Sequence, residues 1–301
     1  MILPQHPTRI RAGTGWSFGT FGELLQGVDR EGSHFLVTLP IARYTIATFE
    51  VDESMDQLSI TPTTKLKSRA MASLLLEIYN LPSKGRLVIK SNLPVGKGLA
   101  SSSADLVATA RAIVNAYHLD FSIEKLLHCL RQIEPTDGVM FDEVVLFYHR
   151  KVQLGQLLGQ LPLLFIVGKD EGGKIDTIEF NKIQRHFSWR ERNEYEFLLN
   201  KVVDAMRRQD LSAIGEVSTR SATLNQAFSK KQYFEPLLDL CARVGALGLV
   251  VAHSGTCIGL LLDPANPRFH EQKKASLEYL AHLPGETVMY QTWTKNNVRE
   301  V

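Results

Sequence analysis

The stretch from Leu93 to Asp105, LPVGKGLASSSAD, most constrains how this chain can fold. It follows a strand-like run at residues 86–91 and precedes a run with helical spacing at residues 104–117. A glycine-containing loop that enters a helix presents unpaired backbone N–H groups at the positive end of the helix dipole. Such a place suits a phosphate group, so the stretch indicates nucleotide binding.

The residues of this stretch suit a phosphate individually as well. Gly96 and Gly98 let the main chain approach phosphate oxygens closely, and Lys97 could add a point charge. The three serines at 101–103 supply hydroxyls for helix capping, for phosphate or for Mg²⁺. The same residues could also merely turn a corner and cap a helix. Their spacing fits neither the P-loop nor the dinucleotide fingerprint.

A resemblance to a known family decides between these interpretations. The pattern Pro94-x-x-x-Gly-Leu-Ala-Ser-Ser-Ser-Ala104 resembles the phosphate loop of the GHMP kinases, the superfamily of galactokinase, homoserine kinase, mevalonate kinase and phosphomevalonate kinase. Two further stretches, Ser17–Gly27 and Ala252–Gly259, resemble other motifs of this family in the same order. The resemblance implies a small-molecule kinase that uses ATP and Mg²⁺.

The composition is that of an ordinary globular enzyme. With 301 residues, 44% of them hydrophobic, the chain can bury one or two cores. A formal net charge of +2 without a basic block indicates neither nucleic acid nor a membrane surface as a partner. The 3 cysteines lie far apart, which favours a reducing cytoplasm, and no apolar run reaches the roughly 18 residues of a membrane span. We expect a cytoplasmic monomer or homodimer.

The order of elements predicts an α+β fold. Strands are expected at 34–51, divided at Pro40, and at 86–91, 144–148, 163–168, 247–252, 256–262 and 287–293. Helices are expected at 68–80, 104–117, 122–133, 189–208, 211–228 and 234–244. This pattern predicts helices on a mostly antiparallel sheet, with domains at residues 1–155 and 156–301. The resemblance implies an N-terminal domain like the second domain of ribosomal protein S5 and a ferredoxin-like C-terminal domain.

A kinase of this kind needs phosphate donors, Mg²⁺ ligands and usually a base. In the superfamily pattern the second serine after Gly-Leu-x binds Mg²⁺, and here that residue is Ser102. Glu134, in the turn Glu-Pro-Thr-Asp-Gly, is the expected carboxylate ligand, with Glu124 as the alternative. Asp137 in the same turn could accept the hydroxyl proton as a general base, or bind the amine of the substrate.

These inferences define a complete candidate site. The residues expected to bind ATP are Pro94, Gly96, Lys97, Gly98, Leu99, Ala100, Ser101, Ser102 and Ser103. Those expected to act in catalysis are Asp137, Ser102 and Lys97, and the Mg²⁺ ligands are Ser102 and Glu134. The first and third family motifs imply acceptor contacts from Ser17, Glu23, Gln26, Asp137, Ser254, Gly255 and Thr256. A basic cluster at Lys65, Lys67 and Arg69 could contact phosphate or be solvated.

Four motifs resemble a narrower group within the family. The stretches 20–27, 94–102, 134–138 and 250–256 resemble the L-threonine kinases of bacterial propanediol utilisation and cobalamin assembly. That resemblance implies a small amino acid substrate and synthesis of O-phospho-L-threonine, the precursor of the aminopropanol linker of the corrin nucleotide loop. Homoserine, serine or an amino alcohol stays an alternative acceptor, because a single methyl group discriminates weakly. A non-catalytic ligand sensor on the same fold is the alternative from another class.

Overall fold

The computed structural model describes residues 11–173 and 186–295. The elements of the first half are β1 (Ala12–Val28), β2 (His34–Glu50), β3 (Leu58–Thr61), α1 (Leu66–Ile78), β4 (Gly85–Ser91), α2 (Ser101–Tyr117), α3 (Ile123–Arg131), β5 (Val144–Tyr148) and β6 (Gln153–Gly159). The helices and strands predicted here are confirmed to within a few residues. Pro40 does not divide the predicted strand, because β2 continues through it.

The elements of the second half are β7 (Phe165–Asp170), α5 (Trp189–Arg208), α6 (Leu211–Asn225), α7 (Phe234–Val244), β8 (Gly248–Val251), β9 (Cys257–Leu262), α8 (Phe269–Ala281) and β10 (Glu286–Gln291). The predicted bounds of α5 and α7 are confirmed, whereas α8 was not predicted. The proposed domain boundary near residue 155 falls within β6 and stays a prediction.

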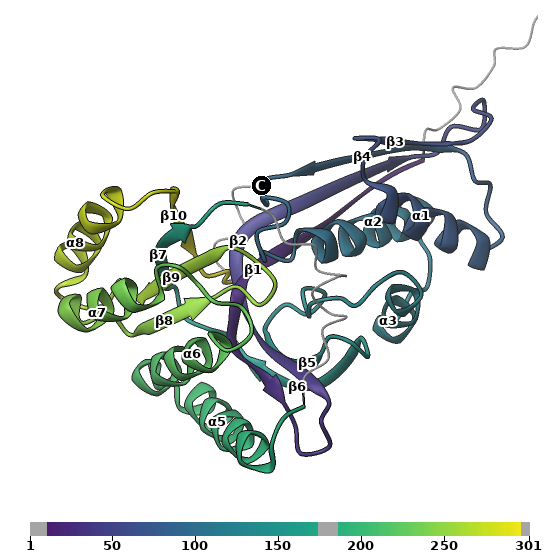
Figure 1. The fold of residues 1–301 in the computed structure, drawn as a ribbon. Coiled ribbons are helices and arrows are strands. Elements are labelled where there is room, and N and C mark those ends of the chain that lie inside the picture. Colours follow the sequence, from purple (N-terminus) through teal and green to yellow (C-terminus); the bar gives the residue numbers. More distant parts are fainter. Residues whose placement is uncertain (1–10, 174–185, 296–301) are drawn as a thin grey trace, which may run out of the picture.

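One sheet joins the two halves of the described chain. Its strands lie in the order β10-β7-β9-β8-β1-β2-β4-β3, and β5 and β6 are attached at β2. Only the β3–β4 pair is parallel among the strand pairs described. Figure 1 shows α1, α2 and α3 gathered at one end of this sheet and α5 to α8 at the other. The expected class, helices on a mostly antiparallel sheet, is confirmed.

The first family motif forms part of a strand that was not among the predicted elements. The stretch Ser17–Gly27 lies inside β1, which pairs with β2 and changes register near Gly19, Gly22 and Leu24. Gly22 has a φ of 54°, in the left-handed region that favours glycine. The next residue, Glu23, pairs with Val251 of β8. This bulged segment of β1 therefore connects the two halves of the sheet.

Glycines of β1 allow α2 to lie directly on the strand. A Cβ atom at Gly13 would be 2.2 Å from the backbone nitrogen of Ala116. A Cβ atom at Gly15 would be 2.3 Å from the carbonyl oxygen of Ala108. Both separations are far below van der Waals contact, so the close packing of α2 on β1 requires glycine at both positions.

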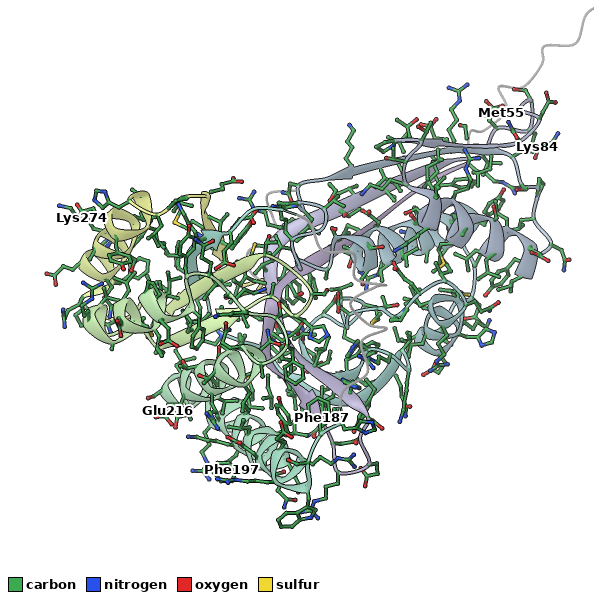
Figure 2. All side chains as sticks on the ribbon, viewed as in Figure 1. Met55, Lys84, Phe187, Phe197, Glu216 and Lys274 are labelled. Atoms are coloured by element: carbon green, nitrogen blue, oxygen red, sulfur yellow. The ribbon has the colours of Figure 1, made fainter. Side chains whose placement is uncertain are left out.

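Three clusters of buried side chains hold the layers together, and Figure 2 shows how side chains fill the space between ribbons. The first lies among α1, α2, α3 and the adjoining strands. The second joins the middle of the sheet to α5 and α6, and the third lies under α7 and α8. Among the described residues, no helix has both the length and the apolar composition that crossing a bilayer requires.

The substitution Gly22→Ala tests the bulge that joins the two halves. Its Cβ would lie 2.1 Å from the carbonyl oxygen of Val251, at a backbone angle that is also strained for alanine. We expect the free energy of unfolding to fall by about 2–4 kcal/mol in urea titrations. Gly172→Ala is the matched control, because Gly172 has a φ of 91° but open space around it. Equal losses in both variants would contradict the close approach.

Candidate active site

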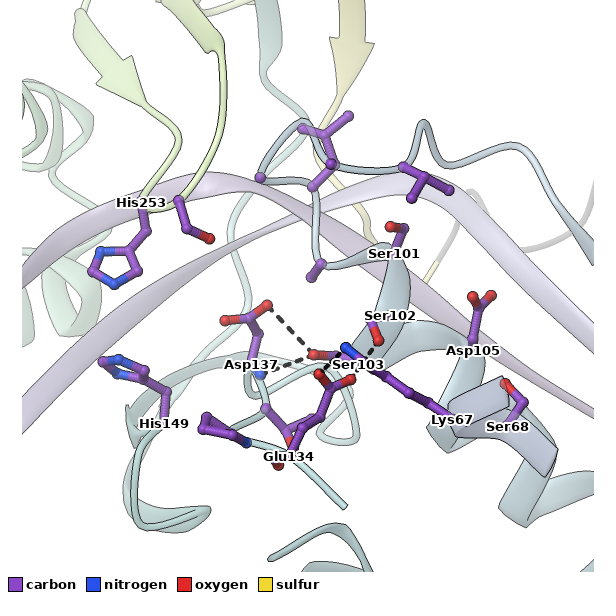
Figure 3. Close-up of a pocket in the computed structure, with 18 of the residues that line it drawn as sticks. Lys67, Ser68, Ser101, Ser102, Ser103, Asp105, Glu134, Asp137, His149 and His253 are labelled. Atoms are coloured by element: carbon purple, nitrogen blue, oxygen red, sulfur yellow. Dashed lines mark hydrogen bonds and ion pairs between the residues drawn. The ribbon is translucent and has the colours of Figure 1, made fainter. Parts of the chain in front are cut away.

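A cavity of about 420 Å³ opens at the N-terminus of α2 (Figure 3). Its walls come from the glycine-containing loop and first turn of α2, from residues 64–68 at the start of α1, and from the turn at 134–137. Glu23, His149, His253 and Ser254 complete the lining. In the view of Figure 3, the two histidines lie to the left of Asp137, and Lys67 lies to its right.

The N-terminus of α2 is arranged to receive an anion. The helix begins at Ser101, three residues earlier than predicted, so the serines form its first turn. No side chain caps this N-terminus, and Ala100 before it is in the left-handed conformation. Backbone N–H groups of the first turn lack partners within the helix and attract negative charge. The loop is fixed by β1, whose Thr20 and Gly22 N–H groups donate to Leu99 and Gly98 carbonyls at 3.3 and 3.4 Å.

Glu134 is held between a hydroxyl and an ammonium group. The Ser102 hydroxyl donates to one carboxylate oxygen, and Lys67 forms an ion pair with the other. Only 7% of Glu134 is exposed, so these partners offset the cost of burying its charge. The structure thus brings together the two residues predicted to bind Mg²⁺. A second ion pair, between Lys65 and Asp105, lies beside them.

Asp137 follows Glu134 in the same turn and faces the first turn of α2. The backbone N–H of Asp137 donates to the Ser103 hydroxyl at 3.1 Å, and that hydroxyl lies 3.4 Å from the carboxylate. Burial, and then the negative charge of Glu134, raise the pKa of Asp137 to about 6. Its carboxylate is therefore a stronger base than an exposed aspartate and is still mostly ionised near neutral pH.

Glu23 brings another carboxylate to the cavity from the bulge of β1. Burial, and then the charge of Asp137, raise the pKa of Glu23 well above its usual value. The Glu23 Oε2 atom has no hydrogen-bond partner among the residues that the structure describes. A buried carboxylate in this position favours a cationic or hydrogen-donating ligand, because such a ligand would supply the missing partner.

The third motif, Ala252–Gly259, packs directly against the phosphate loop. A Cβ atom at Gly255 would lie 2.0 Å from the Lys97 carbonyl oxygen, so the two turns are in direct contact. Thr256 donates to Asp170 at 2.5 Å. Lys97 forms an ion pair with the same carboxylate at 2.6 Å and donates to the Gly173 carbonyl at 2.8 Å. Its ammonium group therefore anchors the loop to the end of β7.

The structure brings most of the predicted site residues to this cavity. Those that line it are Glu23, Gly96, Gly98, Leu99, Ala100, Ser101, Ser102, Ser103, Glu134, Asp137 and Ser254. Those outside the lining are Ser17, Gln26, Pro94, Lys97, Gly255 and Thr256. Ser17 donates to the Val139 carbonyl at 3.1 Å, and Gln26 lines a second cavity. The alternative Mg²⁺ ligand Glu124 is also outside, in the first turn of α3.

Several residues of the cavity were not assigned to the site from the sequence. Lys65 and Lys67 were noted only as a basic cluster, and their ion pairs reach 40 and 67 residues along the chain. Asp105 was read as part of the helix that follows the loop. His149 and His253 enter the lining from two strand ends. The basic cluster Lys65, Lys67 and Arg69, at the start of α1, was the sequence signal for the two lysines.

Comparison with known proteins agrees with this geometry. The model of the GHMP kinase N-terminal domain matches residues 66–149, and that of the GHMP kinase C-terminal domain matches residues 202–273. An L-threonine kinase from Citrobacter freundii is 32% identical over 252 residues, covering 80% of this chain and 83% of the relative. Another, from Salmonella typhimurium, is 31% identical over 249 residues, covering 80% of each. The chain belongs to the GHMP kinase family.

Solved structures of other family members share the fold. A homoserine kinase from Cytophaga hutchinsonii superposes with a TM-score of 0.71 at 14% identity, covering 98% of both chains. The L. major mevalonate kinase in complex with R-mevalonate has a TM-score of 0.69 at 17% identity, covering 98% of this chain and 99% of the other. The GHMP kinase fold implied by the sequence motifs is confirmed.

The substitution Asp137→Asn tests how much the buried charge of Asp137 destabilises the fold. A carboxylate whose folded-state pKa is raised stabilises the fold below its unfolded-state pKa and loses that contribution as pH rises through about 6. The free energy of unfolding of the asparagine variant should therefore exceed that of the wild type by about 1–2 kcal/mol at pH 8. The difference should vanish near pH 4. Urea titrations at both pH values measure it.

The exposed carboxylate Asp239 on α7 provides the matched control, because Asp239→Asn should leave stability unchanged at either pH. An Asp137→Asn variant that is less stable than the wild type at pH 8 would contradict the raised pKa. It would mean that the groups around the ionised carboxylate stabilise it by more than burial destabilises it.

Proposed function

We propose that this chain is a kinase that transfers the γ-phosphoryl group of ATP to the side-chain hydroxyl of L-threonine. The product would be O-phospho-L-threonine, which the motif resemblance connects to the aminopropanol linker of cobalamin. The observation that carries the proposal is the arrangement of Ser102, Glu134 and Asp137 at the N-terminus of α2. One place there can hold a triphosphate and assist deprotonation of a hydroxyl.

The triphosphate would bind at the N-terminus of α2 and at the loop before it. First-turn N–H groups of Ser101, Ser102 and Ser103 supply donors, and Gly96 and Gly98 permit close approach of the main chain. Lys65 and Lys67 line the same cavity, and their ammonium groups are within reach of an added anion. Lys97 stays a predicted phosphate contact, which requires its side chain to leave Asp170.

The Ser102 hydroxyl and the Glu134 carboxylate form a donor set that fits Mg²⁺. This hard cation takes a few protein oxygens and completes its coordination with phosphate and water. Both oxygens are already adjacent, because the Ser102 hydroxyl donates to Glu134. When bound, Mg²⁺ would neutralise charge on the transferred phosphoryl group. Lys67 occupies the other oxygen of Glu134 and would balance this carboxylate in the absence of the metal.

Asp137 would act on the acceptor hydroxyl. As the threonine oxygen forms its bond to the γ-phosphorus, the bond to the ADP oxygen breaks and Asp137 takes the hydroxyl proton. The raised pKa of about 6 suits this role, because the carboxylate is ionised at neutral pH yet more basic than an exposed aspartate. The neighbouring Glu23 can then hold the ammonium group of the amino acid.

Two observations support L-threonine over other acceptors. Two of the curated relatives similar to this chain over most of its length act on that amino acid by name. The buried carboxylates Glu23 and Asp137 also favour an acceptor that carries an ammonium group, which galactose and mevalonate lack. Together they support an amino acid substrate with a hydroxyl close to its ammonium group.

The test is ADP release from Mg-ATP with L-threonine, L-serine, L-homoserine, galactose and mevalonate. We expect the highest kcat/KM with L-threonine. Ser102→Ala and Asp137→Asn should each lower kcat by about 100-fold or more, as expected for removal of a charge-stabilising or proton-accepting group. Ser212→Ala, on the exposed face of α6, is the matched control and should retain full activity. Unchanged turnover in both site variants would contradict the proposal, as would activity with galactose alone.

A further inference from the structure

A second cavity, of about 220 Å³, adjoins the candidate active site at His253, which lines both. It lies between the end of β1, α5 and the end of α6, and Phe187, labelled in Figure 2, forms part of its wall. Its apolar lining consists mainly of Phe187, Tyr195 and Phe228. Its polar lining comes from Gln26, Arg150, Asn225 and two histidines.

Three side chains of this polar lining, Gln26, Asn225 and Arg150, carry a donor without an acceptor among the described residues. The Nε2 of Gln26, the Nδ2 of Asn225 and the Nε of Arg150 are buried, and none has a hydrogen-bond partner among the described residues. Only 5% of Gln26 and 4% of Asn225 is exposed, so water does not readily satisfy them. Unsatisfied buried donors are costly, and a site that contains several of them is suited to a ligand with acceptor oxygens.

The charge of this cavity is opposite to that of the first. Arg150 brings a guanidinium group, and no aspartate or glutamate is among the described residues that line the cavity. Burial is the largest cause that lowers the pKa of His253 to about 3 and that of His34 to about 4, so both are neutral near pH 7. A neutral His253 donates from Nδ1 to the Gln26 Oε1 at 2.6 Å, which leaves the Gln26 amide hydrogens for a ligand.

The bulge of β1 places Glu23, which lines the first cavity, and Gln26, which lines the second, on one face of the strand. Glu23 pairs with Thr38, and Gln26 pairs with Leu36. These partners are two residues apart and therefore share a face of β2. The extra residue inserted in β1 means that Glu23 and Gln26, three residues apart, share the corresponding face. A small ligand on that face can contact a carboxylate at one end and N–H donors at the other.

We propose that Arg150 and Asn225, with Gln26, bind the α-carboxylate of the amino acid acceptor in this second cavity. This inference rests on the proposed function and deepens it, because it identifies the groups that restrict the kinase to acceptors carrying a carboxylate. The ammonium group lies toward Glu23 and Asp137, so the dipole of the bound amino acid matches the opposite charges of the two cavities. The guanidinium and the two amides supply the donors that a carboxylate accepts.

The experiment compares kcat/KM for L-threonine and for L-threonine amide, in which a neutral carboxamide replaces the carboxylate. The wild type should prefer the acid strongly, because the amide leaves the charge of Arg150 unpaired. Arg150→Gln should lower kcat/KM for L-threonine about 30-fold or more, mainly through KM, and change the value for the amide less than about threefold. Asn225→Asp should have the same selective effect, because it replaces a donor with a negative charge.

Arg207→Gln, at an exposed position of α5 outside both cavities, is the matched control and should retain the wild-type preference. Circular dichroism establishes that each variant is folded. Equal losses on the acid and the amide, or no loss on either, would overturn the carboxylate site while leaving the kinase intact. A wild type that phosphorylates neither compound would instead refute the proposed function, and this is visible before any variant is compared.

Discussion

The hydrogen bond from Ser102 to Glu134 is the interaction on which the candidate site depends. It joins the first turn of α2 to the turn that follows α3, and the ion pair of Glu134 with Lys67 adds the start of α1. Because Glu134 is buried, loss of either partner would leave its charge less well compensated. Asp137 is placed by the same turn, so the position of the proposed base follows from that of Glu134.

The bulged strand β1 provides the second constraint. Within the four residues from Thr20 to Glu23, it holds the phosphate loop through N–H groups, pairs with β8 and delivers Glu23 to the cavity. Such close approach leaves no room for a side chain at Gly22. The same bulge sets which later residues share the face of Glu23. In the proposed binding mode, this one irregular strand segment would contact both ends of the amino acid, through Glu23 and through Gln26.

Much of the fold could be predicted from the sequence, because apolar spacing marks helices such as 189–208 and 234–244 directly. The strand β1 could not, because its glycines lower strand propensity and are explained only by the contact with α2. The phosphate loop, Ser102, Glu134 and Asp137 could be assigned by motif. The partners Lys65 and Lys67 could not, because their carboxylates lie 40 and 67 residues away. Arg150 and Asn225 carry no motif and meet only in the folded chain.

Phosphorus NMR of the product would show whether this kinase phosphorylates the hydroxyl of L-threonine, as we propose. After incubation with Mg-ATP and L-threonine, we expect a new phosphomonoester signal that is split into a doublet by the single β-proton of threonine. Consumption of ATP without such a signal, or no reaction although ATP binds, would refute L-threonine as the acceptor. A phosphomonoester formed only with L-homoserine, split into a triplet by its two neighbouring protons, would retain the chemistry and change the substrate.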